Sequence, residues 1–368
     1  MKVLILSCNT GEGHNTAAKA IASALTARGD YCKTEDALAY LSEGMSDFIS
    51  GWHVRIYRRA PVLFNTGYKV VEKTQNGSDK KTLMSRFFSK AANKLAAAVK
   101  AGDFDLVICT HPFSAYMYTL TEREHTLSPK TAFVATDYTC SPTVDKSKLD
   151  LYFIPHESLK SYFVGCFIPE HKLVATGMPV RAEFYRRVDK ITAKRGLGLP
   201  EDKRNILLAC GSMGCGPLKA LAVELAKKLR GDVCLTVICG SNTKLKKQLD
   251  RLKLPQNVRV LGFTNNISLY MDSAEFIITK AGGLTCSEAL AKRLPLLFIN
   301  AVGGCENYNR RFFVDNGMAV ETKGSIAAKA LELLESPDSL ADMVAAMDKI
   351  YAGNAAENIC KVLHGEDF

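Results

Sequence analysis

The sequence predicts an α/β protein made of two doubly wound domains, each with a parallel sheet between layers of helices. Short apolar runs that end in glycine or polar residues alternate with helical patterns, first from Lys2 and again from Asn205. The chain has 368 residues, and one hydrophobic core seldom extends beyond about 250 to 300 residues. Its hydrophobic fraction of 47% is enough to fill two cores. We therefore expect two domains of roughly 150 to 200 residues each.

The amino-terminal domain is expected to span residues 1–180. A helix is predicted at residues 15–28, where several alanines, Ile21 and Leu25 fall on one side. Its apolar runs predict strands at residues 2–7, 106–110, 130–136, 152–155 and 173–175. The charged residues 181–203 are expected to link this domain to the next one.

The carboxyl-terminal domain is expected to span residues 204–352. Strands are predicted at residues 205–210, 234–239, 258–261, 276–279 and 295–299, and helices at 218–229, 327–335 and 339–351. Residues 353–368 are expected to contain a last helix, near Asn358, that returns to the first domain.

One strand, glycine turn and helix in the second domain have the pattern of a phosphate-binding site. The strand at residues 276–279 runs into the turn 280–283, KAGG, and an apolar helix face follows. Glycines let a backbone approach a ligand closely, and the N–H groups and positive dipole of a helix N-terminus suit a diphosphate. Glu288 lies inside the helix, where its carboxylate can accept both hydroxyls of a ribose. Residues 285–288 fit a capping box equally well, with Glu288 bound to the helix start.

Two further glycine-rich turns follow predicted strands. Residues 211–216, GSMGCG, open the next helix and lack the Gly-Lys-Ser/Thr of a Walker loop. Residues 11–16, GEGHNT, approach the G-x-G-x-x-G of dinucleotide sites, with Asp36 near the place of the ribose-binding acid, but Thr16 replaces the third glycine. His14 in this turn would be kept neutral by the helix N-terminus and could accept a proton, unless it is an ordinary loop histidine.

Polar residues end other predicted strands as well. His111 follows the strand at 106–110, and Asp137 follows the strand at 130–136. The carboxyl ends of neighbouring parallel strands face the crevice in which α/β proteins bind ligands. The D-x-D at residues 103–105 resembles a metal-binding motif, but it precedes a strand, so we interpret it as a turn.

Residues 42–100 break the alternation of strands and helices. Residues 53–100 contain eleven Lys and Arg and two acidic residues, a net charge of +9 in a chain of net charge +10. The only tryptophan, Trp52, precedes them. The basic residues nearest to it are Arg55, Arg58 and Arg59. Aromatic rings interleaved with basic side chains suit a membrane interface. A helical insertion with solvated charges is the alternative, and no nucleic-acid recognition motif accompanies the charge.

Composition indicates a protein of the cytoplasm. The twelve cysteines lie mostly inside apolar runs and form no C-x-x-C pair, so we expect buried, reduced thiols. The apolar run at residues 2–7 is too short for a signal peptide. No run approaches the ~18 apolar residues of a membrane-spanning helix.

Motifs in both halves of the chain resemble glycosyltransferase family 28. In the second half, TKAGGLTCSEAL, PLLFIN and GGCENYN resemble the diacylglycerol glucosyltransferases and monogalactosyldiacylglycerol synthases of that family. In the first half, the G-x-G-H-x-x-A-A around His14, the H-P at His111 and the T-D at Asp137 resemble the acceptor domain of these enzymes. The sequence departs from the family at residues 141–144, where relatives carry a histidine and a tryptophan, and at Cys305, where a glutamine is usual.

The resemblance implies a GT-B fold, whose two Rossmann-like domains face a cleft. It implies an inverting hexosyltransferase that uses a UDP-sugar and a lipid acceptor, diacylglycerol, and works peripherally at the inner face of the cell membrane. His14 or Asp137 would be the catalytic base. The implied donor-binding residues are Gly211, Ser212, Gly214, Phe263, Thr264, Lys280, Gly282, Gly283, Leu284, Thr285, Glu288, Glu306 and Asn309. Those implied for the acceptor are Gly13 and His111, and those for an anionic membrane surface are Trp52, Arg55, Arg58 and Arg59.

No metal or cofactor is expected, because helix N-termini and Lys280 can stabilise the leaving UDP. Nucleic acid is not an expected partner. Two other functions stay open: an enzyme of the same fold that uses a UDP-sugar without a lipid, such as an epimerase or a transferase to a soluble acceptor, and a non-catalytic UDP-sugar-binding protein. The departures at residues 141–144 and Cys305 leave the acceptor and the hexose open.

Overall fold

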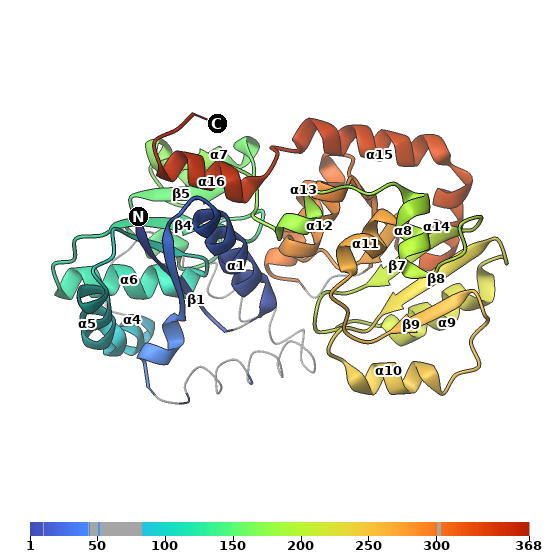
Figure 1. The fold of residues 1–368 in the computed structure, drawn as a ribbon, viewed down its shortest axis with the longest axis horizontal. Coiled ribbons are helices and arrows are strands. Elements are labelled where there is room, and N and C mark those ends of the chain that lie inside the picture. The colour runs from blue at the N-terminus through green and yellow to red at the C-terminus, as the bar shows by residue number, and fades with distance from the viewer. Residues whose placement is uncertain (10, 43, 45–50, 52–82, 300–302, 368) are drawn as a thin grey trace. The chain divides into compact units, whose positions relative to one another are not determined.

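The computed structural model describes residues 1–9, 11–42, 44, 51, 83–299 and 303–367 (Figure 1). The described residues form two compact units. The first unit contains the described residues of Met1–Arg181, Val302–Cys305 and Ala352–Phe368. The second unit contains the described residues of Ala182–Ala301 and Glu306–Tyr351. The residues expected at the membrane, Trp52, Arg55, Arg58 and Arg59, lie outside the described part of the chain.

The first unit is built on a six-stranded parallel sheet in the order β2-β1-β3-β4-β5-β6. Its strands are β1 (Lys2–Ser7), β2 (Tyr31–Asp36), β3 (Leu106–Cys109), β4 (Lys130–Val134), β5 (Leu151–Ile154) and β6 (Leu173–Ala175). Its α-helices are α1 (Glu12–Ala27), α4 (Leu83–Phe88), α5 (Ala92–Gly102), α6 (Pro112–Glu124), α7 (Lys160–Gly165) and α16 (Ala355–Leu363). The strand order reverses beside β1, which is the pattern of a doubly wound sheet.

Apolar side chains project from both faces of this sheet, because helices cover a parallel sheet on each side. Along β1, Val3 and Ile5 pack into one cluster with side chains of α1 and α16. Leu4 and Leu6, which point to the opposite face, pack into a second cluster with α5 and α6. The sheet therefore carries a core on each side, and its strand ends are held in place from both.

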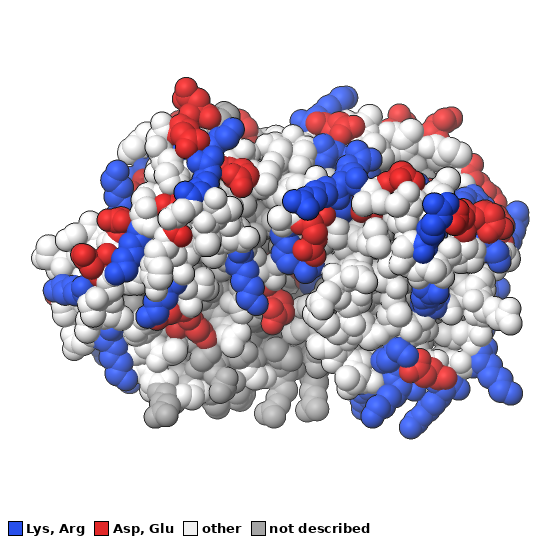
Figure 2. Space-filling view, in the orientation of Figure 1, with Lys and Arg blue, Asp and Glu red and all other residues white. Residues whose placement is uncertain are grey.

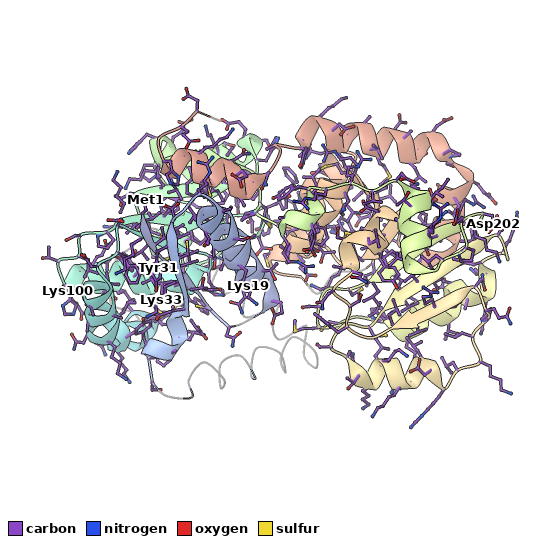
Figure 3. The ribbon with its side chains drawn as sticks, in the orientation of Figure 1. Met1, Lys19, Tyr31, Lys33, Lys100 and Asp202 are labelled. Carbon is purple, nitrogen blue, oxygen red and sulfur yellow. The ribbon has the colours of Figure 1, made fainter. Side chains whose placement is uncertain are left out.

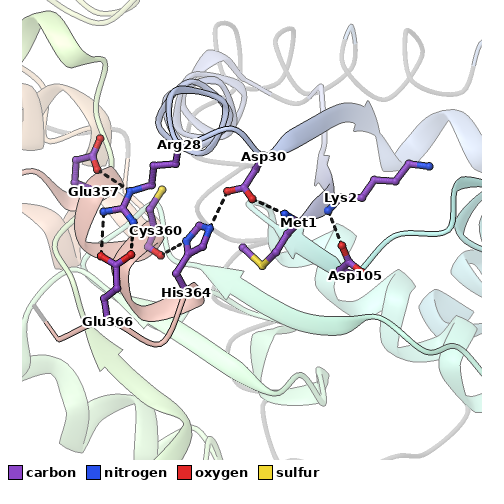
Figure 4. Close-up of polar contacts among 9 residues, drawn as sticks. All are labelled: Met1, Lys2, Arg28, Asp30, Asp105, Glu357, Cys360, His364 and Glu366. Atoms are coloured by element: carbon purple, nitrogen blue, oxygen red, sulfur yellow. Dashed lines mark hydrogen bonds and ion pairs between the residues drawn. The ribbon is translucent and has the colours of Figure 1, made fainter.

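The carboxyl-terminal helix α16 packs against α1, and charged side chains join its end to the start of the chain (Figure 4). Arg28, just after α1, donates through Nη1 to Glu366 at 2.7 Å. Asp30 lies between the two termini: one oxygen is 2.6 Å from the Met1 nitrogen, and the other is 3.1 Å from Nε2 of His364. Residues from both ends of the chain thus complete the first unit.

The second unit has its own six-stranded parallel sheet, in the order β12-β11-β10-β7-β8-β9. Its strands are β7 (Arg204–Ala209), β8 (Val233–Ile238), β9 (Val258–Leu261), β10 (Phe276–Thr279), β11 (Leu296–Phe298) and β12 (Ala319–Glu321). Its α-helices are α8 (Lys190–Leu197), α9 (Leu218–Lys228), α10 (Thr243–Asp250), α11 (Ile267–Asp272), α12 (Gly283–Lys292), α13 (Cys305–Asp315), α14 (Ile326–Glu335) and α15 (Pro337–Ile350). The central strands β7, β8 and β10 are almost wholly apolar and buried.

The predicted α/β fold is confirmed, and the differences lie at edges and helix starts. The sequence did not predict β2, an edge strand on which Tyr31 and Lys33 are exposed (Figure 3). Helix α1 begins at Glu12, three residues before its predicted start, so the turn at residues 11–16 is mostly the first turn of that helix. The prediction of buried thiols is confirmed: none of the twelve cysteines forms a disulfide, and ten of them are buried. Among the described residues, no helix is both long and apolar enough to span a membrane.

Candidate active site

His14 lies at the carboxyl edge of the first sheet, in the first turn of α1. Its Nδ1 is 2.9 Å from the carbonyl oxygen of Thr110 and 2.7 Å from Oγ1 of Thr136. Thr110 follows β3 and Thr136 follows β4, so the ends of two neighbouring strands hold the ring. A carbonyl oxygen can only accept a hydrogen bond, which assigns the ring hydrogen to Nδ1. The lone pair of the neutral ring is therefore on Nε2, and the N-terminus of α1 disfavours the cationic form.

His111 stands beside His14 and has the opposite tautomer. The two ring centroids are 4.3 Å apart in an edge-on arrangement. His111 is the N-cap of α6, and its Nδ1 accepts a hydrogen bond from the backbone N–H of Phe113 at 2.9 Å. Because Nδ1 accepts, the hydrogen of a neutral His111 ring is on Nε2. The two neutral rings thus have their hydrogens on different nitrogens, Nδ1 in His14 and Nε2 in His111.

Gly13 and Asp137 lie at the same edge. Gly13 directly precedes His14 within α1, and Asp137 directly follows Thr136 and is half-buried. Asp137 is therefore the sequence neighbour of Thr136, whose hydroxyl contacts His14. Which of His14 and Asp137 is the catalytic base stays a prediction.

At the carboxyl edge of the second sheet, the loop after β7 and the loop after β8 are joined by hydrogen bonds. The backbone N–H of Ser241 donates to the Ser212 carbonyl at 2.8 Å. Asn242 donates through Nδ2 to the Gly214 carbonyl at 3.1 Å, and its Oδ1 accepts from the N–H of Leu245 at the start of α10. Asn242 therefore fixes the glycine loop and caps a helix at the same time.

Two glycines are required where these loops pack. Gly214 and Gly240 have φ of 56° and 55°, in the left-handed region. A Cβ on Gly214 would lie 1.9 Å from the Cys239 carbonyl oxygen, and one on Gly240 would lie 2.1 Å from the Ser212 carbonyl oxygen. Any side chain at either position would therefore collide with backbone, and the loops would have to separate.

The turn before α12 combines a helix N-terminus with a cation. Helix α12 begins at Gly283, and its N-cap is Gly282, which provides no side chain to occupy the first N–H groups. Lys280 forms an ion pair with Glu306 of α13. A Cβ on Gly211 would lie 3.8 Å from Cε of Lys280, so the lysine also lies beside the loop after β7. A helix N-terminus with an adjacent ammonium group is a favourable place for a phosphate.

The capping-box interpretation of residues 285–288 is wrong. Thr285 lies in the first turn of α12 and is not its N-cap. Ser287 donates through Oγ to the Gly283 carbonyl at 2.9 Å, as a side chain inside a helix does. Glu288 lies further inside the helix and is only 7% exposed. It is therefore a buried carboxylate of the helix interior, placed after the glycine turn and Leu284.

Helix α13 contributes the two other expected donor residues. Glu306 lies in its first turn and contacts Lys280. Asn309 is fully buried, and its Nδ2 donates to the carbonyl of Ala281 at 3.0 Å, which ties α13 to the glycine turn before α12. Glu306 and Asn309 are thus built into the same cluster as Lys280.

Phe263 and Thr264 follow β9 at the same edge of the second sheet. The Phe263 ring is 66% exposed, and an exposed aromatic ring suits stacking against a nucleobase. Thr264 accepts through Oγ1 from the Asn266 N–H at 3.1 Å, which shapes the start of α11.

Metal ligands do not gather at either edge in the described parts of the chain, where no group of three or more His, Cys, Asp or Glu could hold an ion. The D-x-D is a turn, as predicted: Asp103 ends α5 in a left-handed conformation, and Asp105 accepts from the Lys2 N–H at 2.7 Å. Burial raises the pKa of the Cys210 thiol to about 12, so this neighbour of the glycine loop stays protonated and is a poor nucleophile.

Both halves of the chain match known domain families. Residues 14–180 match the monogalactosyldiacylglycerol (MGDG) synthase family, and residues 205–359 match the glycosyltransferase family 28 C-terminal domain. The chain combines an MGDG synthase domain with a glycosyltransferase family 28 C-terminal domain. The matched regions contain His14, His111 and Asp137 in the first unit, and the glycine turns with Lys280 in the second. The protein is therefore an enzyme of the glycosyltransferase class.

Relatives and solved structures match the whole chain. It is 28% identical over 376 aligned positions to a protein of Bacillus cereus named processive diacylglycerol beta-glucosyltransferase, covering 100% of this chain and 94% of that one. A Bacillus anthracis protein of the same name is 27% identical with the same coverage. Acinetobacter baumannii MurG superposes with a TM-score of 0.64 at 18% identity over 99% of both chains. Spinosyn rhamnosyltransferase SpnG gives 0.66 at 14% identity, over 99% of this chain and 100% of its own. The predicted GT-B fold is confirmed.

Sequence reasoning missed the groups that orient the site. Thr110 and Thr136 hold His14, and their only signal in the sequence is a threonine at the end of each predicted strand. Asn242 was also missed, although an asparagine three residues before Leu245 is an N-cap signal. The pairing of Lys280 with Glu306, 26 residues apart, has no local signal at all.

Proposed function

We propose that the enzyme transfers a hexose from a UDP-sugar to diacylglycerol, with inversion at the anomeric carbon, while bound to the cytoplasmic face of the membrane. The observation that carries this proposal is the carboxyl edge of the second sheet, where Lys280 lies beside two glycine turns and the start of α12. The full-length relatives named diacylglycerol beta-glucosyltransferases support the choice of acceptor. They also make UDP-glucose the first donor to test.

On the acceptor side, proton removal is assigned to His14. Its Nε2 lone pair can take the proton of the diacylglycerol hydroxyl while Nδ1 stays bound to the Thr110 carbonyl. That second bond stabilises the imidazolium that forms, because a carbonyl oxygen is a good acceptor for a charged N–H. Asp137 is the alternative base, or the group that balances the new positive charge.

On the donor side, departure of UDP leaves negative charge on the diphosphate. The first N–H groups of α12 and the ammonium of Lys280 can stabilise that charge. Glu288 is proposed to bind the ribose hydroxyls, and Glu306 and Asn309 the hexose hydroxyls. Because Lys280 is paired with Glu306, donor binding and recognition of the sugar are coupled through one ion pair. We propose that no metal or cofactor takes part.

A donor panel tests the proposal. Purified enzyme is incubated with UDP-glucose, UDP-galactose or UDP-N-acetylglucosamine and diacylglycerol in neutral detergent micelles, and the lipids are examined by mass spectrometry. We expect a hexosyl-diacylglycerol from one hexose donor, at a rate that chelator does not reduce. Release of UDP without a lipid product would instead indicate a soluble acceptor. Absence of both would indicate a binding protein, and rescue of a chelated enzyme by manganese or magnesium would overturn the metal-free mechanism.

The basic and aromatic segment around Trp52 is proposed to contact an anionic membrane surface. Each basic residue close to such a surface contributes about 1 kcal/mol, and the attraction fades over a Debye length of ~8 Å at physiological salt. The variant in which Arg55, Arg58 and Arg59 are all replaced by glutamate should lose binding to anionic vesicles and keep its affinity for UDP. Unchanged sedimentation of that variant with anionic vesicles would contradict this part of the proposal.

A further inference from the structure

A lysine-rich groove lies between α9 and α10 of the second unit. Residues 216–253 contain nine Lys and Arg against three acidic residues, a net charge of 9 − 3 = +6. The groove has a volume of about 840 Å³. Figure 2 shows blue Lys and Arg side chains gathered over α10 at the lower right. This stretch is therefore strongly basic, like residues 53–100, and an acidic excess elsewhere reduces the chain's formal net charge to +10.

The charge of the groove is not neutralised within the described part of the chain. Lys219, Lys227 and Lys244 line the groove and are exposed, and none of them forms an ion pair with a described acidic residue. The acidic residue in the lining, Glu224, is bound to the start of α14 through Ser325. The lysines therefore present their charge outward.

The lining indicates which kind of anion fits. Ala220, Val223 and Pro217 form apolar parts of the wall between the lysines, where the alkyl stems of lysine side chains can lie. The lining contains neither arginine nor an aromatic residue. Arginine is the usual choice for forked recognition of single phosphates, and aromatic rings are the usual stacking platforms for nucleic acid bases. Lysines around an apolar floor suit a diffuse anionic surface with an apolar layer beneath it.

We propose that this groove, defined by α9, α10 and their lysines, is a docking surface for an anionic phospholipid bilayer. The inference rests on the proposed function, since a diacylglycerol acceptor resides in a bilayer. The groove adjoins the donor residues, because Gly216 and Asn242 line it and also belong to the two loops joined after β7 and β8. Docking here holds the donor loops against the membrane surface from which the acceptor comes. This surface consists of residues 216–248, which are different residues from those around Trp52.

Vesicle co-sedimentation tests the surface with full-length enzyme. Each lysine close to an anionic surface contributes about fivefold to binding, so loss of three should weaken it about 100-fold. The test variant is Lys219→Gln/Lys227→Gln/Lys244→Gln. The control is Lys130→Gln/Lys323→Gln/Lys349→Gln, which removes the same charge from exposed lysines elsewhere. Vesicles with and without anionic phospholipid are compared at low and physiological salt.

We expect the test variant to lose about 100-fold of its affinity for anionic vesicles and the control to lose less than tenfold. Equal losses in both variants would overturn the proposal, because only net charge would then matter. Lack of binding by the wild type, or tighter lysine-dependent binding of single-stranded RNA than of vesicles, would overturn it too.

Activity in neutral micelles separates this inference from the proposed function. There the test variant should form glycolipid like the wild type, because no anionic surface is present. A wild type that makes no glycolipid in micelles but binds vesicles through these lysines would refute the proposed function and leave the docking surface standing. A variant inactive in micelles would place the lysines in the donor site and refute the docking surface.

Discussion

The two units have the same kind of sheet, and yet their carboxyl edges are built from different parts. In the first unit the edge is made of side chains. His14 and His111 lie in contact and have opposite tautomers. The Thr110 carbonyl holds the ring of His14, and the Phe113 N–H holds the ring of His111. In the second unit it is made of backbone: Gly214 and Gly240 let two loops pack, and α12 starts without a side-chain cap. One edge is suited to move a proton, and the other to hold an anion.

This difference explains how one fold can supply two halves of a transfer reaction. Strand ends and helix N-termini recur in both units because the doubly wound sheet produces them. The loops after the strands decide the chemistry. A half-buried imidazole oriented by Thr110 can act on a hydroxyl group, whereas closely packed glycines and Lys280 favour a diphosphate. Changes confined to one edge should therefore affect one half of the reaction.

The largest expected effect is on the first edge. His14→Ala should reduce kcat by ~10²- to 10⁴-fold, the usual contribution of a general base, and leave UDP affinity nearly unchanged. Single-turnover kinetics with calorimetric titration of UDP separates the two quantities. His125→Ala is the control, because this histidine follows the far end of α6 and contacts Asn93. If His14→Ala has only a mild effect and Asp137→Asn abolishes turnover, the base is Asp137.

The second edge should show the reverse pattern. Glu288→Ala should weaken UDP binding by about 1.5 to 3 kcal/mol, the contribution of a hydrogen bond to a charged group, which is about 10- to 150-fold. Ser287→Ala is a matched control, since Ser287 is a buried polar residue of the same helix whose Oγ donates to the Gly283 carbonyl. Calorimetry with UDP and thermal melting are compared for both variants. Equal UDP affinity for the two variants would remove Glu288 from the donor site.

The sequence predicted central elements well because burial on both faces leaves a plain signal. The apolar runs of β1 and β10 agree with the structure residue for residue. The edge strand β2, YCKTED, was missed because only one neighbour pairs with it and its side chains are largely exposed. Helix α1 starts earlier than predicted because Gly11, Glu12 and Gly13 give no helix signal of their own, and tertiary packing decides the first turn.

The candidate site was predictable in its residue types and not in its contacts. Glycine turns after apolar strands identify Gly214 and Gly283 from local pattern alone. The Thr110 carbonyl that orients His14 is 96 residues away, and backbone groups carry no sequence signature. The helix start at Gly283 also required the structure, because Thr285 and Glu288 fit a capping box in the sequence and lie inside the helix in fact.

A smaller effect is expected from one glycine of the second edge. Gly214→Ala would place a Cβ against the Cys239 carbonyl oxygen and would force an alanine into the left-handed backbone conformation. It should therefore reduce the free energy of unfolding by about 1 to 3 kcal/mol and weaken UDP binding. Gly231→Ala is the control, because nothing lies within 4 Å of its Cβ position, and its effect should stay within about 0.5 kcal/mol. Denaturant unfolding and UDP titration measure both. Wild-type UDP affinity in Gly214→Ala would show that the loop contact is not needed for the donor.

The smallest effect concerns a carboxyl group near the carboxyl-terminal end of α6, away from the His111 cap at its start. Burial raises the pKa of Glu122 to about 7, and the charge of Asp150 acts in the same direction. The folded protein therefore keeps this proton between the ordinary pKa of about 4.5 and pH 7, where the unfolded chain has lost it, so stability falls as pH rises through that range. Glu122→Gln should remove this slope and make the variant relatively more stable above pH 7. Glu124→Gln, an exposed neighbour on α6, controls for the loss of one charge.

Because Glu122 is remote from the edge that holds His14, the pH profile of kcat should be the same in all three proteins. A shifted kcat profile in Glu122→Gln would mean that proton chemistry in the first unit extends beyond its carboxyl edge, and the contrast between the two edges would have to be redrawn.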